Sequence, residues 1–97
     1  MRFGLKESLL QDIINVLSGD KSVLKAVIFG SRARGDYKYN SDIDLAVYCN
    51  KEMSAGLSLD LDDAAGIYKI DVVDMTRLTN QALHKRIEEQ GIEIYSR

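Results

Sequence analysis

Apolar residues recur at helical spacing in three stretches of the chain. The first runs from Leu5 to Leu17, with apolar residues at Leu5, Leu9, Leu10, Ile13, Ile14 and Leu17. Residues Met53 to Ile67 and Leu78 to Gln90 repeat with a similar period, and Thr79 or Asn80 is suited to start the latter helix. The pattern therefore predicts three helices, and a glycine follows the first and the last of them.

Four shorter runs are rich in β-branched and aromatic residues, which is typical of strands. They are Val23 to Phe29, Ser41 or Asp42 to Tyr48, Tyr68 to Val73, and Ile92 to Tyr95. Residues 30–35 form a turn between the first two, with one or two helical turns in it, and residues 36–40 are polar and loop-like. This short link allows the first two strands to pair as antiparallel neighbours.

The order of these elements predicts an α+β fold: a mixed four-stranded sheet with helices packed on one face. The first strand becomes apolar on both faces toward its end, so we expect it to be central in the sheet. Acidic residues of the strands are then expected on the face that the helices leave open.

Composition narrows the class of protein. The chain has 97 residues, 45% of them hydrophobic and 29% charged, so residues 1–97 are expected to form a single soluble domain. A net charge of −2 without a basic block makes extended nucleic-acid binding unexpected.

The lone Cys49 excludes an intramolecular disulfide and is expected to be a buried, inert thiol. No apolar run has membrane-spanning length and no signal peptide is evident, so we expect a cytoplasmic protein without membrane contact.

Three acidic residues of the strands are candidates for metal binding. Asp42 and Asp44 are two residues apart at the start of a strand, so both side chains point to the same face. Hard carboxylate oxygens beside a phosphate-holding turn suit Mg²⁺ shared with a nucleoside triphosphate. Asp71 on the third strand completes the set that two-metal phosphoryl chemistry requires. The structural alternatives are a turn or cap for the first two, and for Asp71 an ion pair with Lys25 or Lys69.

The turn after the first strand offers candidates for phosphate binding. Gly30 permits close approach of the backbone to an anion, and Ser31 adds a hydroxyl donor at the start of a helical turn. A strand-to-helix turn capped by Ser31 is the simpler alternative. The planar guanidinium of Arg34 suits paired phosphate oxygens. Arg32 is expected either to do the same or to face solvent.

Other titratable residues have plainer interpretations. His84 has no Cys or His partner for a zinc site, so it is expected to be a surface or partly buried helix residue. Four other acids are expected to be solvated helix or turn residues: Asp60, Asp62, Asp63 and Asp74.

These residues resemble a known family. Gly30-Ser31, ten residues, then Asp42-Ile43-Asp44 is the pattern of the DNA polymerase β-like nucleotidyltransferase superfamily. The longer stretch GSRARGDYKYNSDIDLAV resembles more closely the minimal nucleotidyltransferases of bacteria and archaea. Together with the KIDVVD strand and the ending EEQGIEIY, the resemblance covers nearly the whole chain.

The resemblance implies a palm-like core and a set of functional residues. The nucleotide-gripping Gly and Ser map onto Gly30 and Ser31, and the arginine of the motif maps onto Arg34. Ser41 precedes the acids as it does in relatives. The metal-binding and catalytic acids map onto Asp42, Asp44 and Asp71, which would hold Mg²⁺, two ions in the family's chemistry.

The resemblance also implies a reaction and a partner. MgATP would give AMP to a hydroxyl group, and pyrophosphate would be released. Minimal nucleotidyltransferases are typically paired with a helical HEPN-domain protein, commonly a toxic ribonuclease, and in some pairs neutralise it as an antitoxin by adenylylating a tyrosine. Two alternatives stand beside this one. One is a binding antitoxin that neutralises its partner by stoichiometric contact, and the other is transfer to a small molecule such as an aminoglycoside.

Overall fold

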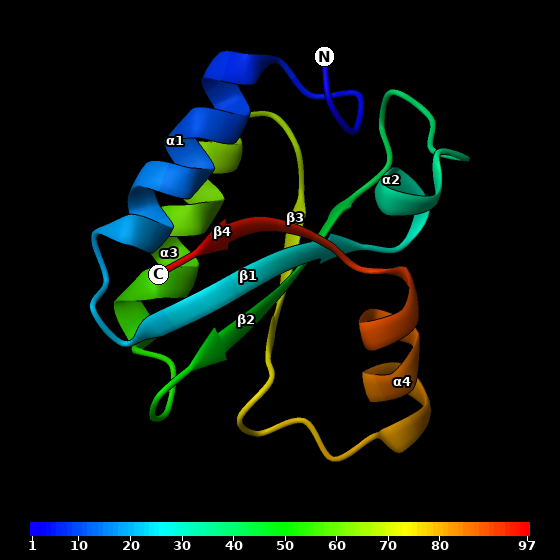
Figure 1. Ribbon diagram of the computed structural model, residues 1–97. Coiled ribbons are helices and arrows are strands. Elements are labelled where there is room, and N and C mark those ends of the chain that lie inside the picture. The colour runs from blue at the N-terminus through cyan, green and yellow to red at the C-terminus, as the bar shows by residue number, and fades with distance from the viewer.

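Eight elements follow one another along residues 1–97, all of which the computed structural model describes (Figure 1). They are α1 Glu7–Ser18, β1 Val23–Phe29, α2 Ser31–Arg34, β2 Ile43–Cys49, α3 Ala55–Ala65, β3 Ile70–Asp74, α4 Gln81–Gln90 and β4 Ile92–Ser96. Every element expected from the sequence is present, with ends shifted by a turn or less.

The four strands form one mixed sheet in the order β3-β2-β1-β4. β1 pairs antiparallel with both β2 and β4, so it is central, as expected. β2 and β3 run parallel because α3 carries the chain back between them. This topology confirms the mixed four-stranded α+β sheet predicted from the order of elements.

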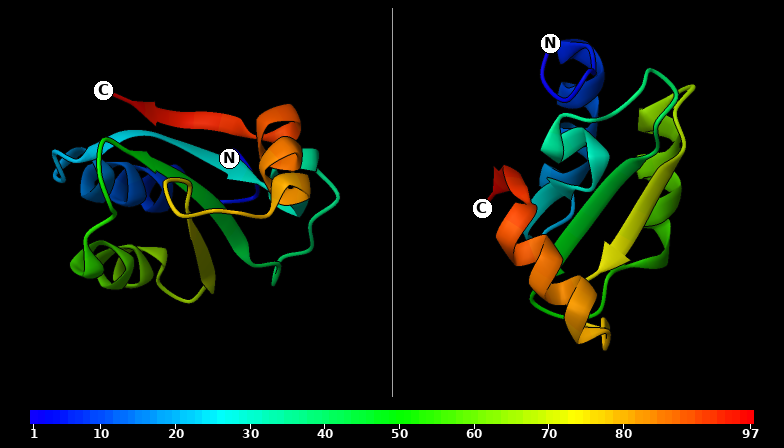
Figure 2. Two further views of the ribbon diagram at one scale, coloured as in Figure 1. Left: turned by 90° about the horizontal axis from the view of Figure 1, so that it is seen from below. Right: turned by 90° about the vertical axis from the view of Figure 1, so that its right-hand side faces the viewer.

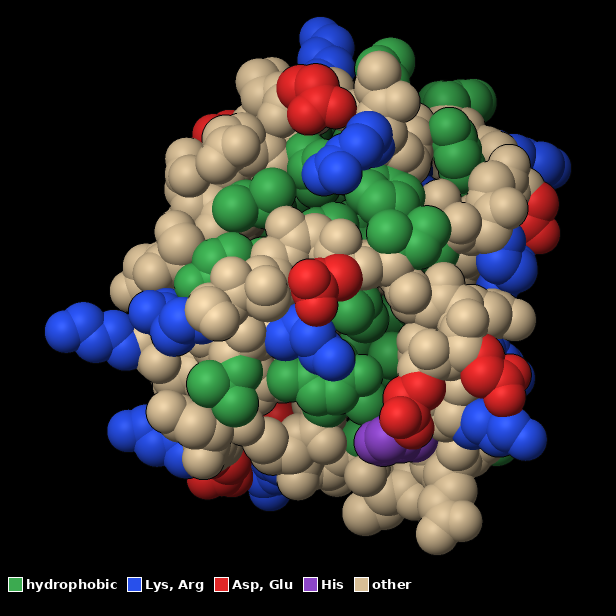
Figure 3. All heavy atoms as spheres, in the orientation of Figure 1, with side chains coloured by type: hydrophobic (Ala, Val, Ile, Leu, Met, Phe, Trp, Pro, Cys, Tyr) green, Lys and Arg blue, Asp and Glu red, His purple; other side chains and the backbone are tan.

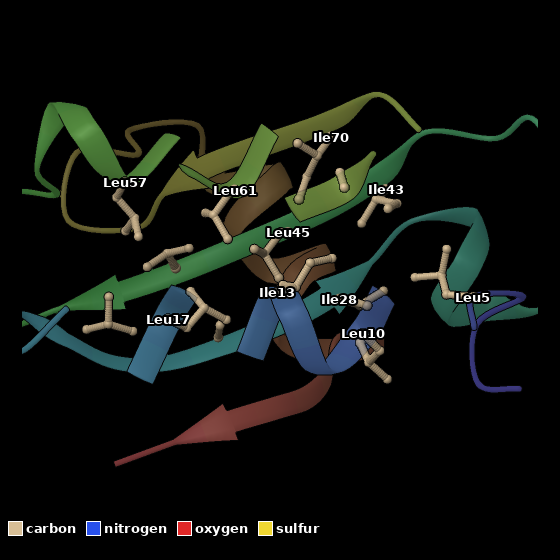
Figure 4. Close-up of a cluster of buried hydrophobic side chains, with 14 of the residues drawn as sticks. Leu5, Leu10, Ile13, Leu17, Ile28, Ile43, Leu45, Leu57, Leu61 and Ile70 are labelled. Atoms are coloured by element: carbon tan, nitrogen blue, oxygen red, sulfur yellow. The ribbon is translucent and has the colours of Figure 1, made fainter. Parts of the chain in front are cut away.

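The main core lies between one face of the sheet and the helices α1 and α3 (Figure 4). Ile13 and Leu17 of α1 and Leu61 of α3 are fully buried there. They meet Ile28 of β1 and Leu45 of β2, which point to this side of the sheet. Burial of large aliphatic side chains contributes about 1.5–3 kcal/mol each, so this layer supplies much of the stability of the fold.

α4 packs on the other face of the sheet, which corrects the expectation that all helices share one face (Figure 2). Ile87 is 1% exposed and contacts a second cluster that includes Val27 and Phe29 of β1 and Ala46 of β2. The physical reason is the alternation along β1, whose end is apolar on both faces. The expectation that the acids lie on a face left open by the helices is corrected as well, because Asp44 shares the face of Ala46, on which α4 packs. Asp44 stands at the start of β2, where it remains partly exposed.

The ends of α4 follow the sequence signals. The Asn80 side chain accepts a hydrogen bond from the N–H of Leu83, so Asn80 rather than Thr79 caps the helix. On the surface drawn in Figure 3, acidic and basic side chains are interspersed among apolar ones. None of the helices combines the length and apolarity that crossing a bilayer would require.

Candidate active site

Three acidic residues line one face at the start of the parallel strand pair. Asp44 of β2 lies directly opposite Asp71 of β3 in the register of the pair. Asp42 immediately precedes β2 and shares the face of Asp44. The side chains of Asp42 and Asp71 are 44% and 48% exposed. The strands thus place on one face the three acids that the sequence singled out.

Asp44 is the most buried of the three acids, and its electrostatics reflect this. Burial raises the pKa of Asp44, and the negative charges of Asp71 and Asp42 raise it further. The charge of Arg34 acts in the opposite direction. A carboxylate whose pKa is raised in this way is stabilised in its ionised form by a nearby cation. The cation offsets both the lost hydration and the repulsion from the neighbouring carboxylates.

Lys69 contributes positive charge to the acidic face. Its Nζ lies 4.0 Å from Oδ2 of Asp42 and 3.9 Å from Oδ1 of Asp71. The ion pair between Asp71 and Lys69, one of the alternatives from the sequence, is therefore formed. Lys25, the other alternative partner of Asp71, instead places its Nζ 4.3 Å from the centre of the Tyr48 ring.

The donor set fits a hard divalent cation in kind. Carboxylate oxygens are the ligands that Mg²⁺ prefers. The mutual repulsion of Asp44 and Asp71 also favours a cation beside them. The side chains are not gathered into a group of three that could ligate one ion as they stand. Metal binding therefore requires side-chain rotation at Asp42 or Asp71, both of which are exposed enough to move.

Gly30 joins the turn after β1 to the acids. Its φ of 74° lies in the region that favours glycine, and a Cβ at this position would overlap Oδ2 of Asp44. The carbonyl of Gly30 accepts hydrogen bonds from the N–H groups of Ala33 and Arg34, at 3.2 and 3.1 Å. Two constraints therefore require glycine here: the backbone conformation and the close approach of Asp44.

Ser31 is the first residue of α2 and is partly exposed beside these acids. Gly30, not Ser31, occupies the N-cap position, so the capping alternative is wrong. With only four residues α2 has little macrodipole. What the turn offers an anion is local: the N–H groups of Ser31 and Arg32, which precede the first helical hydrogen bond, and the Ser31 hydroxyl.

Arg32 does not face the site or the solvent, which corrects both expectations for it. The residue is 2% exposed. Its guanidinium donates to the carbonyl of Phe3 at 2.8 Å, to that of Ser41 at 3.1 and 2.8 Å, and to that of Tyr39 at 3.4 Å. The rings of Tyr37 and Tyr68 lie 5.3 and 4.8 Å from it. With these donors taken up, the Arg32 guanidinium fixes the loop before β2 and is not available to a nucleotide.

Ser41 also serves the loop. Its hydroxyl accepts a hydrogen bond from the N–H of Lys38 at 2.8 Å, and its carbonyl is the one that Arg32 grips. The position next to Asp42 is thus explained by the support of the backbone leading into β2. The expected contact between Ser41 and a nucleotide finds no support in these bonds.

Arg34 is the basic residue that remains free to meet a phosphate. Its side chain is 42% exposed, and its Nε lies 3.4 Å from the Asp36 carboxylate. An exposed pair of this kind contributes little stability, so Arg34 is easily recruited by another anion. Its role in nucleotide binding stays a prediction.

The sequence expectation fails for Asp74 and is confirmed for His84. Asp74 is not simply solvated, because it accepts hydrogen bonds from the N–H groups of Met53 and Thr76 and from the Thr76 hydroxyl. Burial acts to raise its pKa, but the hydrogen bonds from Thr76 and Met53 outweigh this and lower it. His84 is partly exposed on α4, with its Nδ1 2.7 Å from Glu88 (Figure 3), as expected of a helix-surface residue.

The sheet, the acids that line it and the glycine turn define a class of protein. Residues 11–97 match the sequence profile of the family described as polymerase beta, nucleotidyltransferase, and the chain belongs to this family. The family resemblance in the sequence is thereby confirmed. No curated protein matches the chain.

Solved structures of similar fold include toxin–antitoxin complexes. A toxin–antitoxin crystallised with AMP-PNP has a TM-score of 0.77 and 25% identity, over 91% of this chain and 73% of that one. The MntA-HepT toxin–antitoxin has a TM-score of 0.72 and 22% identity, over 95% and 74%. A tri-AMPylated HEPN toxin in complex with MNT antitoxin, from Shewanella oneidensis, has a TM-score of 0.70 and 21% identity, over 92% and 71%. At the lower identities the likeness establishes the fold alone.

Proposed function

We propose that this protein is a Mg²⁺-dependent nucleotidyltransferase that transfers AMP from ATP to a hydroxyl group of a HEPN-domain toxin and acts as its antitoxin. The observation that carries the proposal is the contact between the two halves of the motif. Gly30, at the phosphate-holding turn, lies directly against Asp44, which Asp71 faces across the strand pair. A triphosphate at the turn would therefore lie beside the acids that hold its metal.

In the proposed site, the turn after β1 binds the triphosphate and the acids of the strands bind the metal. Ser31, through its hydroxyl and N–H, and the adjacent N–H of Arg32 would hold the triphosphate, and Arg34 would meet its outer oxygens. Asp42, Asp44 and Asp71 would hold Mg²⁺. Bound there, Mg²⁺ neutralises the charge of the phosphates and favours ionisation of the attacking hydroxyl.

The proposed transfer is a displacement at the α-phosphorus of ATP. The acceptor oxygen forms a bond to this phosphorus as the bond to the oxygen bridging the α- and β-phosphates breaks. Pyrophosphate leaves with the electron pair of the broken bond. The hydroxyl proton passes to the carboxylate of Asp71, which stands half-exposed and returns it to solvent.

The nature of the acceptor is supported by the similar structures. The Shewanella oneidensis complex holds a HEPN toxin that carries AMP groups, and another similar toxin–antitoxin binds the ATP analogue AMP-PNP. A tyrosine on the partner is the acceptor that the family resemblance implies. This acceptor would reach the acids at the start of the strand pair, where Asp42 and Asp71 are exposed.

Labelled ATP tests the proposal. The purified protein is mixed with Mg²⁺, the product of its neighbouring gene as the candidate HEPN-domain partner, and ATP labelled at the α- or the γ-phosphate. We expect label on the partner from α-labelled ATP only, and none with Asp44→Asn. Label from γ-labelled ATP would mean phosphoryl transfer and would overturn the proposed reaction.

Neutralisation by binding alone is the second candidate, because the similar structures are complexes of antitoxin with toxin. Asp42→Asn separates the two. If binding alone neutralises the toxin, this variant protects cells as well as the wild type does. If transfer is needed, it forms the complex but does not protect.

A further inference from the structure

Lys69 and the three acids form a charged quartet on one face of the parallel strand pair. The register places Ile43 beside Ile70 and Asp44 beside Asp71. The N–H of Ile43 donates to the carbonyl of Lys69 at 2.8 Å, which extends the pairing by one step. Because alternate residues of a strand share a face, Asp42, Asp44, Lys69 and Asp71 all point the same way.

Within the quartet the ammonium lies between two of the acids. Nζ of Lys69 is 4.0 Å from Asp42 and 3.9 Å from Asp71, while no ion pair joins it to Asp44. Three carboxylates and one ammonium leave a formal charge of −2 on this face. A divalent cation that reached the same oxygens would have to replace the ammonium or share them with it.

The Lys69 contacts are weak enough to be exchanged. Its side chain is 71% exposed, and both distances lie at the outer limit of an ion pair. Exposed pairs of this kind contribute about 0–1 kcal/mol. The four-carbon stem of lysine also lets the ammonium swing away without any movement of the strand.

We propose that Lys69 is a positioning residue, an internal counter-ion that restrains Asp42 and Asp71 and that a divalent cation must displace to bind the acids. The inference deepens the proposed function and rests on its metal site. Lys69 lowers the affinity of the acids for the metal alone. It also offsets part of the repulsion between Asp42 and Asp71 while no other cation is bound.

The test measures binding of Mn²⁺, as a spectroscopic stand-in for Mg²⁺, to the full chain by electron paramagnetic resonance, without nucleotide or partner. Lys69→Met removes the ammonium and keeps a stem of similar length. We expect it to bind Mn²⁺ about tenfold more tightly than the wild type, since a unit positive charge beside the metal is lost. Lys69→Arg keeps the charge and is expected to bind within about twofold of the wild type.

Lys85→Met is a matched control. Lys85 is 77% exposed, and its Nζ lies 3.8 Å from Glu89 on α4, so the variant loses a similar exposed ion pair that involves none of the three acids. We expect its Mn²⁺ affinity to equal that of the wild type. Circular dichroism confirms that each variant is folded.

The outcomes separate this inference from the proposed function. If Lys69→Met binds Mn²⁺ no more tightly than the wild type, the counter-ion role is overturned and the metal site stands. If neither the wild type nor Lys69→Met binds Mn²⁺, the metal site fails and this inference fails with it. Tighter binding by Lys85→Met to the same degree would show a general effect of net charge and would also overturn the role.

Discussion

Gly30 and Asp44 are packed so closely that no side chain fits between them. The antiparallel register of β1 and β2 places Phe29 opposite Asp44, so the turn after β1 begins beside this carboxylate. The two ends of the sequence motif are thus one structural unit. A substitution at either residue is therefore expected to displace the other.

Gly30→Ala tests this unit. The new methyl group would collide with Asp44, and the residue would be held at a φ of 74°. We expect a loss of about 2–3 kcal/mol in the free energy of unfolding, measured with urea, and loss of nucleotide binding. Gly56→Ala is the control, since this helical glycine has open space around it and the change should stabilise the protein by about 0.5–1 kcal/mol. Equal stability of the two variants would contradict the prediction.

Asp44→Asn is expected to stabilise the fold in the absence of metal while abolishing transfer. Burial and the neighbouring acids raise the pKa of Asp44 in the folded protein. The ionised carboxylate therefore costs stability at any pH above the folded pKa, and this cost disappears as the pH falls below the unfolded value. Removing the charge should raise the melting temperature at pH 7 by roughly 3 °C. Asp60→Asn, at an exposed position of α3, should leave it unchanged, and a lower melting temperature for Asp44→Asn would count against the raised pKa.

Arg32→Ala is expected to destabilise the protein severely. The carbonyls of Phe3 and Ser41 would lose their donors, and a space would open between the rings of Tyr37 and Tyr68. We expect a loss of about 3 kcal/mol or more in urea unfolding. The matched change Arg34→Ala, at an exposed side chain, should cost no more than about 0.5 kcal/mol. A small effect at Arg32 would return it to the candidate nucleotide ligands.

Asp20 is expected to make the fold sensitive to acid. Its carboxylate accepts hydrogen bonds from the Ser22 hydroxyl and N–H and from the Ser54 hydroxyl, which lower its pKa below the ordinary value, aided by the charge of Arg97. Because the folded pKa is depressed, this stabilisation is complete above the unfolded pKa of about 3.9 and is lost as the pH falls through the folded pKa. Urea midpoints measured between about pH 5 and 2 should fall more steeply for the wild type than for Asp20→Asn. Parallel curves would contradict this.

Local patterns were sufficient to predict every helix and strand, because periodicity and turn residues agree along the whole chain. The face covered by α4 was not predictable in the same way. Ile87 belongs to a helix with few apolar residues, and only the second apolar face of β1 shows where it packs. Apolar residues on both faces of β1 indicate a central strand, but they do not by themselves tell which helix covers which face.

The site was predictable to the extent that strands determine side-chain direction. Asp42, Asp44 and Asp71 share a face as alternation requires. Arg32 and Arg34 are equally spaced on either side of Ala33, and nothing in their spacing tells which one is buried. Arg32 is the buried one because of its contacts with Phe3 and Tyr68, which are distant in the sequence and come near Arg32 only in the folded chain.

The packing of Tyr37 and Tyr68 around Arg32 also has an optical consequence. The chain contains five tyrosines and no tryptophan, so tyrosine dominates its ultraviolet fluorescence. Two of the emitters lie within 5.3 and 4.8 Å of the guanidinium carried by the same short helix as Ser31. A nucleotide that shifts this helix would change their emission, which gives the protein an intrinsic reporter of occupancy that needs no label.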